Sequence, residues 1–311
     1  MKRDLSGYRH FAIAPLTGAI GAEIGGIDAA QAQDEAVAAE LRRALDEFHV
    51  LFFRDQHLDE GGIVRFAGIF GSVGNEPLAN RLDGAPPVGR LVREADAPAD
   101  MRNFGDRWHM DRAGDDCPSR GFVLYNEEAP DYGGDTMFAS LSAAYDALSP
   151  ELQARFAGLT GVHSMSGVFG LDEHSRRIKR VLGPKYRDPP TANAEQLALI
   201  RHEAEHPLVC RHPVTGRPFL FVSGYYFLRI RELPEAESDQ LVEELNRHAS
   251  RPDFTCRFRW RPGSIAVLDN RCTMHYAVND YAGFARRMMR VELRGDWRPE
   301  RAAALQHREK G

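Results

Sequence analysis

The stretch Arg107-Trp108-His109-Met110-Asp111 sets a histidine and a carboxylate two residues apart. Side chains at this spacing on an extended chain point to the same side, so His109 and Asp111 can grip one divalent metal ion. They would supply two of the three ligands of the two-histidine-one-carboxylate face found in non-haem Fe(II) oxygenases. The competing interpretation is an ordinary surface pair, and the rest of the chain has to decide between the two.

Length and composition limit the classes of protein to consider. The 311 residues are 43% hydrophobic, which is enough for a large core, and we expect a single domain over 1–311. A formal charge of -5 without any basic block argues against nucleic acid as a partner. No apolar stretch is long enough to span a membrane, and four scattered cysteines favour reduced thiols in a cytoplasmic protein. Composition leaves the oligomeric state open, a homo-oligomer included.

Hydrophobic periodicity and capping signals predict an α+β protein that is mainly β. Helices are expected near 34–48, 59–70, 142–148, 150 onward and 235–248. Extended segments are expected near 49–53, 121–125, 137–139, 208–210, 219–222, 254–260, 264–268 and 286–293. Two long polar segments, about 72–106 and 164–195, are predicted to be mobile loops; the second is either a solvated surface segment or a lid over a site.

The stretch His202-Glu203-Ala204-Glu205-His206 matches the H-E-x-x-H pattern of zinc peptidases, which is one alternative function. In that pattern two histidines on one helical face share a zinc ion, and His212 stands where the extended form would place a third histidine. Pro207 follows directly and disfavours helical backbone at His206. The stretch therefore favours a solvated helix end over a zinc site.

A second histidine, with an arginine beyond it, stands near the end of the chain. Asp269-Asn270-Arg271 follows a predicted strand, His275 comes soon after, and Arg286 opens the last strand. With Trp108-His109-Met110-Asp111 and Gly133-Gly134-Asp135-Thr136, this block resembles the taurine/2,4-dichlorophenoxyacetate (TauD/TfdA) family of Fe(II)- and 2-oxoglutarate-dependent dioxygenases. The resemblance runs from about Leu16 to Trp297, and the motifs come in the family's order.

The resemblance implies a double-stranded β-helix, or jelly roll, with flanking helices. It implies that His109, Asp111 and His275 are the metal ligands and form the catalytic centre, with Fe(II), 2-oxoglutarate and O2 as cofactors. It also implies that Thr136 and Arg286 hold the far carboxylate of 2-oxoglutarate. The chemistry agrees, because a guanidinium makes a bidentate charge-assisted pair with a carboxylate and a hydroxyl adds one further bond.

Arg290 lies four residues after Arg286, on the same face of the predicted strand. The matching arginine of the taurine enzymes helps to bind the sulfonate of their substrate. The resemblance therefore implies a small anionic substrate held by Arg290. The other interpretation of Arg290 is a structural ion pair.

Other positions depart from the taurine enzymes and argue against taurine itself. Glu76-Pro77 stands where those enzymes carry a histidine before a proline, and an acid suits a sulfonate poorly. Arg112 follows Asp111 where the family often has a small or β-branched residue, which makes Arg112 a candidate substrate contact. The family lines its substrate pocket with aromatic side chains. Phe169, Tyr225 and Tyr226 stand at the corresponding positions, so they are candidate substrate contacts. Ordinary core packing is an equally good interpretation of all three.

Hydroxylation with release of succinate and CO2 is the implied reaction. The presence of Asp111 argues against halogenation. Halogenating enzymes of this type lack the carboxylate ligand, and the halide takes its place on the metal. Desaturation, cyclisation and oxidative cleavage stay open as outcomes of the same cofactor chemistry. A non-catalytic metal-binding jelly roll is an alternative from another class, and it would have no need for Thr136 and Arg286.

Overall fold

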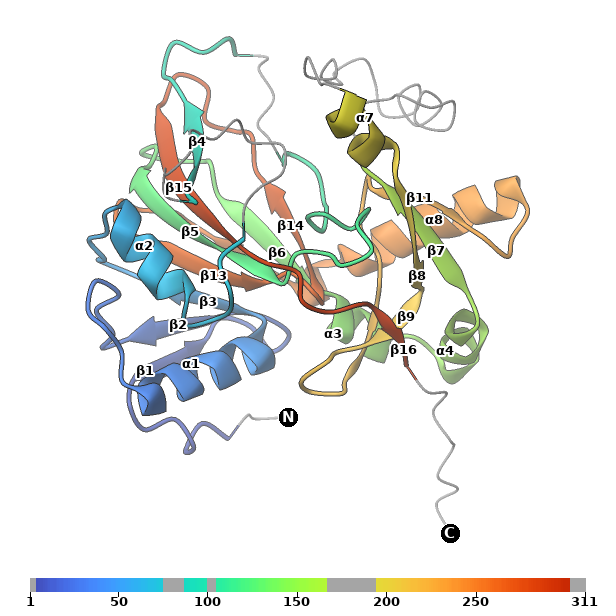
Figure 1. Cartoon of the computed structure of the whole chain (residues 1–311), viewed down its shortest axis with the longest axis horizontal. Coiled ribbons are helices and arrows are strands. Elements are labelled where there is room, and N and C mark those ends of the chain that lie inside the picture. The colour runs from blue at the N-terminus through green and yellow to red at the C-terminus, as the bar shows by residue number, and fades with distance from the viewer. Residues whose placement is uncertain (1–3, 75–86, 100–104, 167–193, 303–311) are drawn as a thin grey trace.

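The computed structural model describes residues 4–74, 87–99, 105–166 and 194–302, and strands dominate them (Figure 1). The strands are β1 Ala12–Pro15, β2 Ala22–Gly25, β3 Val50–Phe53, β4 Gly89–Arg93, β5 Gly121–Glu128, β6 Thr136–Ser140, β7 Thr160–Ser164, β8 Glu203–Pro207, β9 Val209–Arg211, β10 Pro218–Leu220, β11 Phe227–Ile230, β12 Thr255–Phe258, β13 Ile265–Asp269, β14 Thr273–Ala277, β15 Arg286–Leu293 and β16 Glu300–Arg301. The helices are α1 Glu35–Phe48, α2 Glu60–Ala67, α3 Leu141–Asp146, α4 Pro150–Ala157, α7 Ala194–Arg201 and α8 Glu235–Ala249, with a 3-10 turn at Pro252–Phe254.

Two sheets face each other across a shared core. The larger has seven strands in the order β1-β2-β3-β13-β5-β15-β4, and the smaller has the order β12-β6-β14. Side chains from both sheets meet in one cluster, for example Phe52 of β3 stacked on Phe258 of β12 with ring centroids 4.0 Å apart. This arrangement matters for function because β6 and β14 of the small sheet and β5 and β15 of the large one enclose the candidate site described below.

Helices α1 and α2 lie against the other face of the large sheet (Figure 1), where their apolar sides join a second core cluster. Leu41, Leu45 and Phe48 of α1 are buried at helical spacing, as the sequence predicts. The Asp59 side chain accepts a hydrogen bond from the backbone N–H of Gly62 and so caps the start of α2. Both helices therefore begin where the capping signals place them.

The remaining strands form two small sheets, β11-β7-β8 and β10-β9-β16. Helix α8 lies beside β11 (Figure 1), and its buried Leu241 and Leu245 join the third core cluster. The predicted hairpin between residues 208 and 222 is present as the antiparallel pair β9 and β10. No helix among the described residues is both long and apolar enough to cross a membrane.

The structure corrects one expectation about the polar segments and leaves the other untested. The predicted loop 72–106 contains strand β4, which pairs with β15 at the edge of the large sheet. Arg90 and Arg93 flank only two apolar residues in Gly89–Arg93, so this edge strand has no apolar alternation that would reveal it in the sequence. Within the segment 164–195, residues 167–193 lie outside the described residues, so the lid hypothesis stays a prediction. The described part shows a mixed, sheet-rich fold with few helices.

Candidate active site

His109 and His275 form a directly bonded backbone pair. The His109 N–H donates to the carbonyl of His275 at 3.0 Å, and the His275 N–H donates to the carbonyl of His109 at 2.8 Å. Their imidazole centroids are 4.0 Å apart, although the two residues are distant in sequence. The chain therefore brings the two predicted histidine ligands side by side through its main chain.

Asp111 completes a compact group of three ligand atoms, which we call the triad. Its carboxylate oxygens lie 3.4 Å from Nε2 of His109 and 3.9 Å from Nε2 of His275, and the three ligand atoms all lie within 4.8 Å of one another. His109 Nδ1 donates to the carbonyl of Arg107 at 2.7 Å, which leaves Nε2 with a lone pair directed at the triad. The donor set and its spacing suit one divalent metal ion.

The electrostatics of the triad also suit a metal. Burial by itself favours the neutral acid at Asp111, but the Arg290 guanidinium outweighs it and holds the pKa of Asp111 well below its usual range. Burial, followed by the nearby His109 ring, holds the pKa of His275 well below its usual value. An ionised carboxylate beside a neutral imidazole is the protonation state that metal binding requires.

The backbone around Asp111 is less regular than the strand that the sequence predicts. His109 takes part only in single bridges, to Gly224 and to His275, and Arg112 has a left-handed φ of 54°. The side chain of Asn270 holds Asp111 in place of a strand partner. Its Oδ1 accepts from the Asp111 N–H at 2.9 Å, and its Nδ2 donates to the Asp111 carbonyl at 2.9 Å. Asn270 stands in the Asp269-Asn270-Arg271 stretch, but the sequence alone does not reveal this role.

A close backbone approach on the other side of His109 was also missed from the sequence. Gly224 has φ of 62°, and a Cβ there would lie 1.7 Å from the carbonyl oxygen of Trp108, so only glycine fits. The approach sets the Tyr225 ring against the His109 ring, with centroids 5.1 Å apart and planes inclined by 19°. In the sequence, a glycine directly before two tyrosines is the feature that could have indicated this close approach.

A narrow cavity of about 50 Å³ holds the triad together with Thr136, Arg286 and Arg290. Phe122, Leu124 and Met288 of the large sheet supply apolar walls. Arg286 and Arg290 lie four apart on β15 and both face this cavity, as their spacing predicts. All five residues predicted to bind metal or 2-oxoglutarate therefore meet in one place.

Thr136 is placed by the turn before β6. Gly133 and Gly134 have φ of 75° and 64°, and a Cβ on Gly133 would lie 2.6 Å from the backbone oxygen of Asp280. The Asp280 side chain accepts a hydrogen bond from the Gly134 N–H at 2.8 Å. The glycine pair thus lets the chain turn tightly against Asp280 and enter β6 with Thr136 at the cavity.

Arg286 is a buried cation, with 7% of its surface exposed. Its Cζ lies 5.9 Å from the ring centroids of both Trp260 and Tyr281. Among the described residues no carboxylate lies within salt-bridge distance of Arg286, and burial lowers its pKa from the usual value. A buried guanidinium without a carboxylate partner in the described chain is matched to an anionic ligand.

Arg290 and Arg112 differ in their surroundings. Arg290 Nη2 contacts Oδ2 of Asp111 at 2.9 Å at the cavity wall. Arg112 Nε donates to Asp115 at 2.6 Å, and its Nη1 lies 3.4 Å from Glu292. Two carboxylates therefore match the charge of Arg112, and its predicted contact with substrate stays a prediction.

The aromatic residues predicted for the substrate pocket divide into two groups. Tyr225 and Tyr226 lie next to the triad, with ring centroids 5.1 Å and 6.5 Å from that of His109. Phe169 lies outside the described residues, and so does the dipeptide Glu76-Pro77. The structure therefore places two of the three predicted aromatic residues beside the metal site.

The zinc-peptidase alternative fails on geometry. His206 lies on strand β8 rather than on a helix, where its Nε2 donates to the carbonyls of Ala113 and Asp115. His202 contacts Asp116 on the surface, and His212 contacts the buried Asp269. The three histidines of the pattern point to three separate places.

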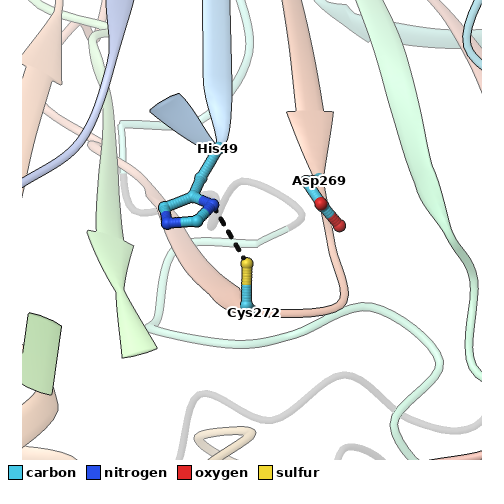
Figure 2. Close-up of side chains that lie close together, drawn as sticks. All are labelled: His49, Asp269 and Cys272. Atoms are coloured by element: carbon cyan, nitrogen blue, oxygen red, sulfur yellow. Dashed lines mark hydrogen bonds between the residues drawn. The ribbon is translucent and has the colours of Figure 1, made fainter. Parts of the chain in front are cut away.

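A second buried group of possible ligand type surrounds the turn between β13 and β14. Figure 2 shows His49 and Cys272 pointing toward one another, with Sγ and Nδ1 3.3 Å apart, and Asp269 nearby. Arg271 occupies both oxygens of Asp269, and His212 bonds to the same carboxylate. Burial raises the pKa of the Cys272 thiol well above its usual range. In this second cluster the Asp269 carboxylate is therefore already matched by a cation of the chain itself.

A wider hollow of about 650 Å³ lies beside α1, away from the triad. Four arginines line it, and each bonds to a protein oxygen: Arg42 to Glu35, Arg43 to Gly7, Arg120 to Asp296 and Arg217 to Asp146. Size alone would favour this hollow as a binding site. We assign the chemistry to the smaller cavity, because that cavity contains the convergent ligands and the buried cation.

Comparison with known proteins agrees with this geometry. The family model described as "Taurine catabolism dioxygenase TauD, TfdA family" matches residues 12–291. An alkylsulfatase from Acinetobacter baylyi is 35% identical over 287 residues, which cover 90% of this chain and 84% of the relative. An alpha-ketoglutarate-dependent sulfate ester dioxygenase from Pseudomonas putida is 32% identical over 289 residues, which cover 91% and 89%.

Solved structures show the same likeness in three dimensions. A taurine dioxygenase from Burkholderia xenovorans superposes with a TM-score of 0.74 at 33% identity. The match covers 94% of this chain and 93% of that one. Sequence and fold comparisons thus point to the same group of proteins.

Proposed function

We propose that this chain, which belongs to the taurine catabolism dioxygenase TauD, TfdA family, hydroxylates a small anionic organic substrate in the triad cavity. The chain is an Fe(II)- and 2-oxoglutarate-dependent dioxygenase. Its triad, His109, Asp111 and His275, is proposed to hold the metal. When bound, Fe(II) supplies the redox chemistry that couples decarboxylation of 2-oxoglutarate to oxidation of the substrate by O2.

The observation that carries the proposal is the buried Arg286 beside the triad. A metal-binding protein without catalysis needs ligands but no buried cation for a cosubstrate. Arg286 is proposed to pair with the far carboxylate of 2-oxoglutarate, and Thr136 to donate a hydrogen bond to the same group. The reaction would then release succinate and CO2, with one oxygen atom passing to the substrate.

We also propose the architecture that usually accompanies such a site. The two facing sheets, with β6 and β14 on one side and β5 and β15 on the other, support a double-stranded β-helix as the fold. The helices α1 and α2 outside the large sheet support the flanking-helix description. Residues 1–311 are proposed to form one dioxygenase domain.

The substrate is proposed to carry an anionic group that Arg290 binds. Arg290 lies in the cavity wall with its guanidinium over the Phe122 ring, 4.8 Å from the centroid. The relatives named above act on sulfate esters or on a sulfonate, according to their names. A sulfate ester of a small alcohol is our first candidate. Hydroxylation of the carbon next to the ester oxygen would leave an unstable product that collapses to an aldehyde and inorganic sulfate.

The first experiment tests the reaction class. Purified protein is mixed anaerobically with Fe(II) and 2-oxoglutarate, the weak visible charge-transfer band is recorded, and succinate is measured after air is admitted. Wild type should show both the band and succinate, and His109→Ala should show neither. His202→Ala is the matched control, because His202 is an exposed histidine outside the cavity. Wild type without either signal would refute the proposal.

The second experiment tests the anion site. A panel of an alkyl sulfate, an alkyl sulfonate, an aryloxy acid and the corresponding neutral alcohols is screened for substrate-dependent succinate formation. Arg290→Ala should raise KM for the best anion by about tenfold or more, since a charged hydrogen-bonded pair contributes about 1.5–3 kcal/mol. Because Arg290 also contacts Asp111, metal content is measured in parallel, and uncoupled 2-oxoglutarate turnover should fall less than substrate-dependent turnover.

Arg287→Ala is the matched control for Arg290→Ala. Arg287 lies on the same strand and makes exposed ion pairs with Glu94 and Glu128 instead of facing the cavity. Equal KM changes in both variants would exclude Arg290 as an anion ligand. A preference of wild type for the neutral alcohols would exclude the anionic substrate class itself.

A further inference from the structure

Trp260 contacts the proposed 2-oxoglutarate site from behind. It lies just after β12 and is 2% exposed. Its indole Nε1 donates a hydrogen bond to Oγ1 of Thr136 at 2.9 Å, across 124 positions in the sequence. Its ring packs edge to face on Phe258, with centroids 5.0 Å apart. One side chain therefore reaches Thr136 and also lies next to Arg286, whose Cζ is 5.9 Å from the indole centroid.

The direction of this hydrogen bond restricts what Thr136 can do. An indole N–H is a donor only, whereas a threonine hydroxyl has one hydrogen and two acceptor lone pairs. Because Trp260 occupies a lone pair of Thr136 Oγ1, the hydroxyl hydrogen is left for a different partner. Thr136 lines the cavity together with Arg286, so an acceptor in the cavity is the matching partner. A carboxylate is such an acceptor, since it only accepts when ionised.

We infer that Trp260 is a positioning residue for the cosubstrate: its N–H turns Thr136 into a hydrogen-bond donor, so that Thr136 and Arg286 together grip the far carboxylate of 2-oxoglutarate. The inference rests on the proposed function, because Thr136 and Arg286 are assigned to 2-oxoglutarate there. The competing explanation is that Trp260 only fills the core and satisfies its own N–H. If Trp260 acts through Thr136, its effect on 2-oxoglutarate binding should disappear when Thr136 loses its hydroxyl. If Trp260 only fills the core, its effect should not depend on Thr136.

A double-mutant cycle separates them. Trp260→Phe, Thr136→Val and the double variant are loaded with Fe(II) under nitrogen, and the Kd of 2-oxoglutarate is measured by titration calorimetry. Trp260→Phe should weaken binding by about three- to tenfold, in the range of one lost hydrogen bond, and Thr136→Val by at least as much. In the Thr136→Val background, Trp260→Phe should have almost no further effect. Equal weakening in both backgrounds would overturn the inference.

A ligand comparison provides a readout that core packing does not affect. 2-Oxopentanoate has the keto acid of 2-oxoglutarate but no far carboxylate. Trp260→Phe should leave its Kd unchanged, so that the preference for 2-oxoglutarate over 2-oxopentanoate falls by the same three- to tenfold. A preference that stays at the wild-type value would refute the role of Trp260 while leaving the proposed function intact. Wild type that binds neither ligand would refute both.

The chain offers a matched control in Trp297, which is also buried and packs on an aromatic ring, that of Phe219. Trp297→Phe also removes a buried indole N–H, but away from the cavity, and should leave the Kd of 2-oxoglutarate unchanged. If Trp260→Phe does not fold, replacement of Trp260 by benzothienylalanine keeps the ring shape and removes only the N–H. That variant should show the same loss of preference, and wild-type preference in it would overturn the inference.

Discussion

Two buried clusters contain histidine and aspartate, the triad and the second cluster around His49, Asp269 and Cys272, and they differ in how an arginine meets the carboxylate. In the triad, Asp111 directs its carboxylate at two imidazoles, and Arg290 contacts one oxygen from the cavity wall. In the second cluster, Arg271 contacts both oxygens of Asp269. The residue types are nearly the same in both places. The position of the guanidinium decides whether a carboxylate is available to a cation.

The largest expected effect comes from a substitution that removes a ligand charge from the triad. Asp111→Asn keeps the shape of the side chain but removes its charge, so metal affinity and succinate formation should each fall by at least about a hundredfold, because residues behind a ligand already contribute 10–100-fold. Metal content after dialysis and succinate release measure the two effects. Asp115→Asn, which alters a carboxylate on the following turn, is the control and should retain metal. Retention of metal by Asp111→Asn would contradict the assignment.

The next largest effect is on stability and comes from a substitution that removes the cation of the second cluster. Arg271→Met should lower the free energy of unfolding by about 3–5 kcal/mol, because it leaves the carboxylate of Asp269 buried without its cation. Urea unfolding measures the loss. The double change Asp269→Asn with Arg271→Met should recover part of it, since no buried charge then remains. A stability loss without any recovery would show that Arg271 acts through packing alone.

The smallest effect tests whether the second cluster holds metal at all. Cys272→Ala should lower the free energy of unfolding by only about 1 kcal/mol, as for an ordinary small core side chain. Both wild type and Cys272→Ala should bind one metal ion per chain. Two ions in wild type and one in the variant would reverse the comparison between the clusters.

The sequence predicts the site better than it predicts the supports of the site. His109, Asp111 and His275 lie in motifs whose spacing and order carry their chemistry, and the structure brings them together. Asn270 and Gly224 support the triad from distant parts of the chain. Their roles depend on backbone atoms of a partner segment, and residue spacing contains no information on that partner.

The fold shows the same division. Elements with a clear period or cap, such as α1, α2 and β15, appear close to their predicted limits. Strand β4 was missed because an edge strand of only five residues with two arginines has no apolar alternation to detect. Its pairing with β15 supplies the order that its own sequence does not predict.

The backbone pair between His109 and His275 has a consequence for how such a chain can change over evolutionary time. Main-chain hydrogen bonds set the separation of the two imidazoles, and these bonds do not depend on side-chain identity. Loops of the intervening chain that do not carry Asp111, Gly224 or Asn270 can therefore change in length without altering the separation of the two imidazoles. A change in those loops would alter the surroundings of the cavity while the pairing of His109 with His275 stays in place.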